Sequence, residues 1–104
     1  MSLLSVVIPA YNEGAMIHKT AEVVSSLLSE NNIEYEIIFV NDGSKDNTWK
    51  IIEELHRQDH VFSGINLSRN RGHQNALLAG LMTAKDYADA VISMDATYRT
   101  ILMP

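Results

Sequence analysis

The chain has 104 residues, of which 46% are hydrophobic and 20% charged, so it can form one globular domain with a buried core, and collagen-like, low-complexity and disordered chains are excluded. Its 8 Lys and Arg against 13 Asp and Glu give a formal net charge of −5, which argues against a nucleic-acid partner because such proteins need a basic face. The lack of cysteine excludes disulfides, thiolate catalysis and cysteine-ligated metal sites.

Hydrophobic periodicity predicts an alternation of strands and helices along the first half of the chain. Leu4–Ile8 is a β-branched run typical of a buried strand, and Pro9 is expected to end it. Across Ala15–Ser29 the apolar residues recur at helical spacing. Tyr35–Val40 is expected to form a second strand, closed by the turn-rich segment Asn41–Ser44.

The second half of the chain continues the alternation. Capping residues predict a helix over about Asp46–Gln58, and Val61–Leu67 is expected to form a strand that Gly64 weakens. A third helix is expected to start at about Gly72. Its apolar side is expected to consist of Leu77, Leu78, Leu81 and Ala84. Ala90–Met94 is expected to form the fourth strand.

The order βαβαβαβ predicts an α/β fold, a Rossmann-like parallel sheet with right-handed crossovers and helices on both faces. Folds of this kind bind ligands outside the carboxyl ends of their strands. Polar residues gather at all four of these ends, in Tyr11–Glu13, Asn41–Ser44, Ser68–His73 and Asp95. A ligand site is therefore expected at this edge of the sheet.

The first two polar segments carry groups suited to a nucleoside, and each also has an ordinary structural interpretation. Tyr11 offers a stacking face and Glu13 offers acceptors for ribose hydroxyls, but the same segment can be a plain helix entry with Asn12 as the cap. Asp42 can accept a hydrogen bond from a nucleobase, but Asp-Gly-Ser is also typical of a β-turn followed by capping residues. The residues alone leave both interpretations open.

The other two polar segments suit phosphates and a metal ion. Arg69, Arg71 and His73 surround Gly72 at a predicted helix N-terminus, where positive donors and free backbone N–H groups can bind phosphate, although a solvated basic loop has the same composition. Asp95 can hold Mg²⁺ or Mn²⁺ against a diphosphate, or can simply be solvated. The glycine patterns of Walker A loops and of dinucleotide-binding folds are absent, which argues against a P-loop NTPase and against a nicotinamide-dependent enzyme.

Taken in order, these segments resemble the donor-binding half of a family 2 glycosyltransferase of GT-A fold. The matching segments are Ser5–Glu13, Glu36–Thr48, Leu67–Gly72 with Ala76–Leu81, and Val91–Ala96. The resemblance covers about residues 4–96 of a partial GT-A domain that spans residues 1–104. The third segment is most similar to polyprenyl-phosphate sugar transferases, the group that contains dolichyl-phosphate mannose synthase and bactoprenol glucosyltransferases.

The resemblance implies a set of residues that bind a nucleotide-sugar, a UDP- or GDP-sugar. These residues are Pro9, Tyr11, Glu13, Val40, Asp42, Asn70, Arg71, Gly72 and Asp95. By this resemblance Val40 is a backbone contact, and Asp95 is the first acid of an Asp-x-Asp motif that holds Mg²⁺ or Mn²⁺ and the diphosphate. The metal offsets charge on the departing nucleoside diphosphate while a polyprenyl phosphate or saccharide acceptor attacks the anomeric carbon of the hexose.

The chain departs from the family pattern after Asp95. Thr97 stands where the second acid is expected, and a hydroxyl cannot replace the charge of a carboxylate, so weakened metal binding is expected. The segment 97–104 does not match, and the acceptor half with its general base is missing. We therefore expect a truncated or altered reading frame of a longer enzyme, with no catalytic residue in this chain and no transfer by the chain alone.

Three alternatives remain beside this interpretation. The first is a non-catalytic nucleotide-binding module that has lost the metal motif. The second is a fragment that folds only by assembling into a homo-oligomer, because the strand Ala90–Met94 is left as an uncovered edge. A nucleotidyltransferase is disfavoured because no glycine-rich loop follows the first strand. The sequence contains no membrane span, and the expected location is cytoplasmic, at the cytoplasmic face of the membrane for an intact enzyme.

Overall fold

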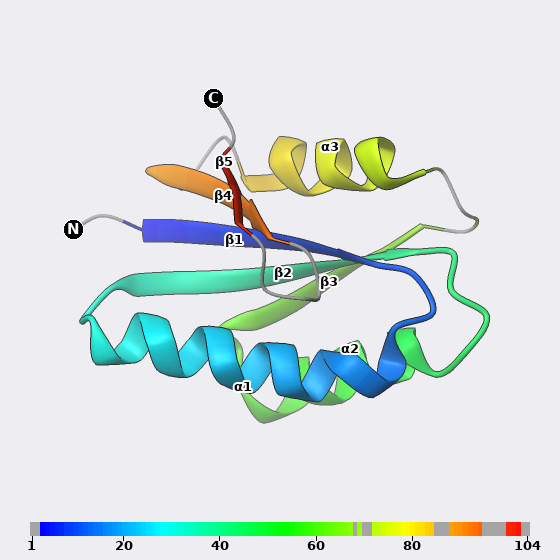
Figure 1. Cartoon of the computed structure of the whole chain (residues 1–104), viewed down its shortest axis with the longest axis horizontal. Helices are drawn as coiled ribbons and strands as arrows, with labels where there is room; N and C mark the ends of the chain where they lie inside the picture. Colours follow the sequence, from blue (N-terminus) through cyan, green and yellow to red (C-terminus); the bar gives the residue numbers. More distant parts are fainter. Residues whose placement is uncertain (1–2, 68, 70–71, 85–87, 95–99, 103–104) are drawn as a thin grey trace.

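A single mixed sheet organises the computed structural model, which describes residues 3–67, 69, 72–84, 88–94 and 100–102 (Figure 1). Its strands are β1 (Leu3–Ala10), β2 (Glu34–Asp42), β3 (Phe62–Leu67), β4 (Ala90–Met94) and β5 (Thr100–Leu102). The strand order is β3-β2-β1-β4-β5, with β1 to β4 parallel and β5 antiparallel to β4. The helices between the parallel strands are α1 (Gly14–Glu30), α2 (Thr48–Gln58) and α3 (His73–Ala84). The predicted α/β fold with alternating strands and helices is confirmed.

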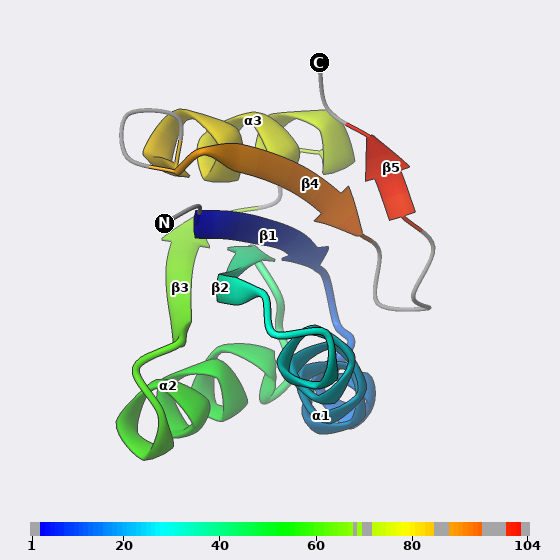
Figure 2. The same cartoon turned by 90° about the vertical axis from the view of Figure 1, so that its left-hand side faces the viewer.

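The helices cover both faces of the sheet, α1 and α2 on one face and α3 on the other (Figure 2). Successive strand residues point to opposite faces, so both faces of β1 and β2 contribute to a core. Phe39 is fully buried in the cluster under α1 and α2, whereas its neighbour Val40 is fully buried in the cluster under α3. Burial on both faces explains why these strands read as continuous apolar runs rather than alternating ones.

Pro9 lies inside β1 and does not end it. Strand β1 continues to Ala10, and Pro9 pairs in register with Val40 of β2. The pairing of β1 with β4 stops at Val7, so among the described residues Pro9 has a strand neighbour on one side only. A residue without an N–H is tolerated at such a position because fewer ladder hydrogen bonds pass through it.

The amphipathic stripe predicted for the first helix is confirmed. Ile17, Ala21, Val24 and Leu28 of α1 are all buried, with exposed fractions of 0, 2, 2 and 7%. These residues pack on the face of the sheet that carries Phe39.

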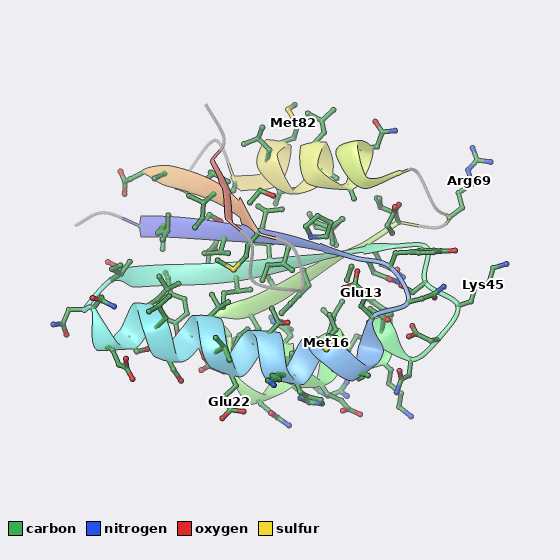
Figure 3. All side chains as sticks on the ribbon, viewed as in Figure 1. Glu13, Met16, Glu22, Lys45, Arg69 and Met82 are labelled. Atoms are coloured by element: carbon green, nitrogen blue, oxygen red, sulfur yellow. The ribbon has the colours of Figure 1, made fainter. Side chains whose placement is uncertain are left out.

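Helix α3 packs on the sheet through small residues, of which Ala84 belongs to the expected apolar side. Ala76, Gly80 and Ala84, spaced by four residues, are buried, whereas Leu78 and Met82 are each 52% exposed. Figure 3 shows Met82 on the side of α3 that faces away from the sheet. The prediction that Leu78 belongs to the buried side is therefore wrong.

The reason is the close approach of α3 to β1. A Cβ atom on Gly80 would lie 2.3 Å from Cγ1 of Val7, so only a glycine fits between the helix and the strand. Leu78 and Met82 lie on the exposed side of the helix.

Gly64 has a similar packing role under α2. A Cβ atom there would lie 2.6 Å from Cγ2 of Ile52 and 2.8 Å from Cζ3 of Trp49. The glycine that was expected to weaken this strand lets α2 pack against it.

Strand β4 is not the edge of the sheet. It lies between β1 and β5, with Ser93 opposite both Val7 and Ile101. The expectation of an uncovered edge at Ala90–Met94 is therefore wrong, because β5 pairs with β4 on the side away from β1. In the part of the chain that the structure describes, every helix is too short or too polar to cross a membrane.

Candidate functional site

The loops that follow β1 and β2 are joined by two reciprocal hydrogen bonds. The backbone N–H of Asn12 donates to Oγ of Ser44 at 2.9 Å, and the backbone N–H of Lys45 donates to Oδ1 of Asn12 at 2.8 Å. Asn12 has a φ of 52°, a left-handed conformation that asparagine tolerates better than most residues. Its side chain therefore links two loops instead of capping α1, so the interpretation of Asn12 as a helix cap is wrong.

The N-terminus of α1 is capped by residues from the next loop. The backbone N–H of Glu13 donates to Oγ1 of Thr48 at 3.1 Å, and the N–H of Gly14 donates to Oδ2 of Asp46 at 3.2 Å. Oδ1 of Asp46 accepts from the N–H of Thr48 at 3.0 Å and also from the Thr48 hydroxyl. One carboxylate thus satisfies N–H groups at the starts of both α1 and α2, where the helix dipoles also favour negative charge.

These contacts lower the pKa of the Asp46 carboxyl below its ordinary value. The hydrogen bond from the Thr48 hydroxyl is the main cause, partial desolvation opposes it, and the backbone N–H groups of Thr48 and Gly14 lower it further. With these partners, Asp46 acts as a structural carboxylate that holds two loops together.

An amide pair joins β3 to the same network. Asn41 and Asn66 lie opposite each other in the register of β2 and β3. Nδ2 of Asn41 donates to Oδ1 of Asn66 at 2.8 Å, and Oδ1 of Asn41 accepts from the N–H of Ser44 at 3.3 Å. Hydrogen bonds therefore connect the carboxyl ends of three adjacent strands.

A hollow of about 520 Å³ opens above these three strand ends. Its lining consists of Tyr11, Asn41, Gly43, Ser44, Lys45, Trp49, Asn66, Leu67 and Arg69. Two of these residues are cationic, and none of the described lining residues is acidic, although the chain as a whole has a net charge of −5. Figure 3 shows Lys45 and Arg69 at the same end of the molecule, where the parallel strands end. The hollow suits a ligand that combines a flat ring with negative charge or hydrogen-bond acceptors.

The residues expected to bind the base and ribose of the donor fall into three groups. Tyr11 lines the hollow and is 41% exposed. Glu13 is half-buried at the start of α1. Pro9, Val40 and Asp42 are buried in the strands and are not among the residues that line the hollow; by strand alternation they share the face of the sheet that α3 covers.

The expected phosphate and metal residues are only partly described. Gly72 is exposed and has a φ of 89°, a conformation that glycine adopts without strain. Asn70, Arg71 and Asp95 lie outside the described residues, as does Thr97. Within the described ranges, no group of three or more His, Asp or Glu side chains is arranged to hold a metal ion.

Trp49 and Asn66 line the hollow but were not expected there. Trp49 lies in the first turn of α2, where it also packs against the core cluster under α1 and α2. Asn66 is an amide one residue before the end of an apolar strand, and that position is the signal that points to a strand-end site. Only the register of β2 and β3 brings it opposite Asn41.

Comparison with known proteins gives consistent matches. The family model described as Glycosyl transferase family 2 matches residues 5–97. YkoT of Bacillus subtilis (strain 168), an uncharacterized glycosyltransferase, is 43% identical over 100 residues, which cover 90% of this chain and 30% of that protein. The undecaprenyl-phosphate 4-deoxy-4-formamido-L-arabinose transferase of Proteus mirabilis (strain HI4320) is 39% identical over 94 residues, which cover 89% of this chain and 28% of that protein.

A solved structure matches the fold. The mannosyltransferase PcManGT from Pyrobaculum calidifontis, in complex with GDP-Man and Mn²⁺, superposes with a TM-score of 0.71 at 20% sequence identity, covering 89% of this chain and 27% of that chain. This chain therefore corresponds to one part of a GT-A structure, and it spans less than a third of the length of the curated relatives described above.

Proposed function

The chain belongs to glycosyl transferase family 2, and we propose that it forms the region of such an enzyme that binds the nucleotide-sugar donor. The observation that carries the proposal is the hollow at the carboxyl ends of β1, β2 and β3, which combines the Tyr11 ring with amide groups and two cations. Ligands of α/β folds bind at this edge of the sheet.

The proposed donor is a UDP- or GDP-sugar. Tyr11 stacks on the base, Asp42 accepts a hydrogen bond from it, and Glu13 accepts from the ribose hydroxyls. The remaining proposed contacts are Pro9, Val40, Asn70, Arg71, Gly72 and Asp95. Support comes from the GDP-Man bound by the mannosyltransferase of the same fold.

The proposed cofactor is Mg²⁺ or Mn²⁺, held by Asp95 together with diphosphate oxygens. Bound there, the metal would offset charge on the departing nucleoside diphosphate. The sequence supplies one carboxylate and, two residues later, the Thr97 hydroxyl, a donor set weaker than two carboxylates for a hard cation. We propose that this chain binds the metal weakly. The Mn²⁺ in the mannosyltransferase structure supports the choice of ion.

In a complete enzyme, the proposed reaction is transfer of a hexose to a polyprenyl phosphate or a saccharide, at the cytoplasmic face of the membrane. The relative from Proteus mirabilis, named for transfer involving undecaprenyl phosphate, supports a lipid-phosphate acceptor. This chain aligns with only 28% of that relative and carries Thr97 in the metal motif. We propose that it binds the donor without transferring sugar by itself.

Calorimetric titration with UDP and GDP, each with and without Mn²⁺, tests the donor site. We expect saturable binding of one of the two nucleotides that Asp42→Asn weakens. The matched control is Glu22→Gln, which neutralises a carboxylate on the outer side of α1 (Figure 3) and is expected to leave binding unchanged. If the folded chain binds neither nucleotide, or if Asp42→Asn binds as tightly as the wild type, the proposed donor site is wrong.

A second candidate function is a non-catalytic nucleotide-binding module. Thr97 is the observation that favours it, because a module that only binds nucleotide does not need the second acid. Nucleotide binding that is indifferent to Mn²⁺ would favour this candidate, whereas sugar transfer to polyprenyl phosphate by the purified chain would exclude it.

A further inference from the structure

The orientation of the Asn66 side chain is determined by its neighbour. Asn41 uses both ends of its amide, because Oδ1 accepts from the N–H of Ser44 and Nδ2 donates to Oδ1 of Asn66. Asn41 is 3% exposed, so its amide is held in place by the sheet around it. The oxygen of Asn66 must therefore face Asn41, and the nitrogen of Asn66 faces the other way.

The Asn66 amide nitrogen is available to a ligand. Asn66 is exposed and lines the hollow at the strand ends, and its Nδ2 has no hydrogen-bond partner in the part of the chain that the structure describes. An amide nitrogen carries two hydrogens and no lone pair that can accept. At this point the wall of the hollow presents a pure donor.

The cationic side chains that line the hollow with Asn66 are also hydrogen-bond donors. Lys45 and Arg69 also line the hollow and carry only hydrogen-bond donors, and no described lining residue carries a carboxylate. The hydroxyl oxygen of Ser44 already accepts from the N–H of Asn12. A ligand group that accepts a hydrogen bond is matched at Asn66, whereas a group that donates one at this point meets another donor.

We propose that Asn66 is a specificity-determining residue that distinguishes a carbonyl from an amino group on the nucleobase. This assignment rests on the proposed function, and it identifies the part of the base that the hollow recognises. Nδ2 of Asn66 donates to the carbonyl oxygen at C4 of uracil or at C6 of guanine. The amino group that cytosine and adenine carry at the corresponding carbon would place a donor against a donor, and the hydrogen bond would be lost.

Two nucleotide pairs probe this contact, and the comparison of wild type with Asn66 variants isolates it. UDP and CDP differ at C4 and in the protonation of N3, and GDP and ADP differ at C6, N1 and C2. We expect the wild-type chain to bind the carbonyl member more tightly than the amino member. Asn66→Asp keeps the side-chain shape and the oxygen that accepts from Asn41 but replaces the donor with an acceptor. We expect it to reduce the UDP-to-CDP or GDP-to-ADP affinity ratio by about threefold to tenfold, the effect of one hydrogen bond.

Two further variants control the comparison. Gln58→Glu makes the same amide-to-acid change at the far end of α2 from Trp49, about 13.5 Å along the helix, and should leave the ratio unchanged. Asn66→Ala removes the donor without adding charge and should reduce the ratio by a smaller factor. It keeps the proposal testable if Asn66→Asp does not fold, which thermal unfolding would reveal.

The outcomes separate this proposal from the proposed function. If the wild type binds UDP or GDP and both Asn66 variants keep the wild-type affinity ratio, Asn66 does not read the base and this inference fails while the donor site stands. If the folded wild type binds none of the four nucleotides, both proposals fail. A reduced ratio in the Asn66 variants, with Gln58→Glu unchanged, supports the assignment.

Discussion

Asp46 accepts a hydrogen bond from the backbone N–H of Gly14, which lies 32 residues earlier in the chain. The same carboxylate accepts from the N–H of Thr48 at the start of α2. One side chain thus caps two helices from different parts of the sequence and joins the loops that border the hollow. The capping of α1 and the shape of the candidate site are consequently coupled.

Replacement of Asp46 by alanine should destabilise the protein. The variant leaves the N–H groups of Gly14 and Thr48 without their acceptor, and loss of a helix cap typically costs about 1 kcal/mol in the free energy of unfolding, up to about 2 kcal/mol. Urea unfolding measures the change, with Glu22→Ala as the control on an outer helix surface. Equal stabilities of Asp46→Ala and the wild type would contradict a capping role.

The stability of the protein should decrease in acid because of the same carboxyl. The pKa of Asp46 lies below its ordinary value of 3.8, mainly because of the Thr48 hydroxyl. A carboxyl with a lowered folded-state pKa contributes stability above its unfolded-state pKa, and this contribution is lost as the pH falls through the folded-state pKa. Asp46→Asn should lack this acid-dependent contribution to stability. Urea unfolding of both proteins from neutral pH to below 3.8 measures the contribution, and parallel profiles of unfolding free energy against pH would contradict it.

Gly80→Ala should destabilise the packing of α3 on the sheet. The added Cβ would lie 2.3 Å from Cγ1 of Val7 and 3.2 Å from Cγ2 of Val40, both buried atoms that cannot move freely. Overpacking of this kind costs about 1–3 kcal/mol, and the better helix propensity of alanine returns less than about 1 kcal/mol. Thermal unfolding tests this. Met82→Ala, at a 52% exposed position of the same helix, should change stability much less.

Asn12 should matter both for stability and for nucleotide binding. Asn12→Ala loses the acceptor for the N–H of Lys45 and places a Cβ in a left-handed backbone, whereas Asn12→Gly loses only the acceptor. We expect the alanine variant to be less stable than the glycine variant by about 1 kcal/mol. Both should bind UDP or GDP more weakly than the wild type, because the two loops are no longer held together. Wild-type nucleotide affinity in both variants would show that the loop link does not shape the site.

Tyr11 should contribute to nucleotide affinity through its ring. Stacking of a base on an aromatic side chain is worth about 1–3 kcal/mol by alanine substitution. Tyr11→Ala should therefore weaken UDP or GDP binding by about fivefold or more, while Tyr11→Phe should retain most of the affinity. Calorimetry measures both, and an equal loss in the two variants would point to the hydroxyl instead of the ring.

The part of the site that could be predicted is the part that depends on chain order. Parallel strands that alternate with helices place their carboxyl ends together, so Tyr11 and the Asn41–Ser44 segment are predicted at one edge of the sheet. Tyr11 and all of that segment except Asp42 line the hollow there. Asn66 and Trp49 could not be assigned in this way. Their place in the hollow depends on the register of β3 against β2 and on how closely α2 lies over Gly64.

The spacing of apolar residues within single segments was enough to predict the type and order of the elements from β1 to β4 and the buried stripe of α1, but it did not predict β5. The face of α3 that meets the sheet depends on packing between elements, since the contact of Gly80 with Val7 leaves room for no larger side chain. It also decided what caps α1, because the acceptors come from Asp46 and Thr48 in another loop. Periodicity reports the faces of a single element, whereas close approach and capping across loops depend on distances between elements that come together only in the folded chain.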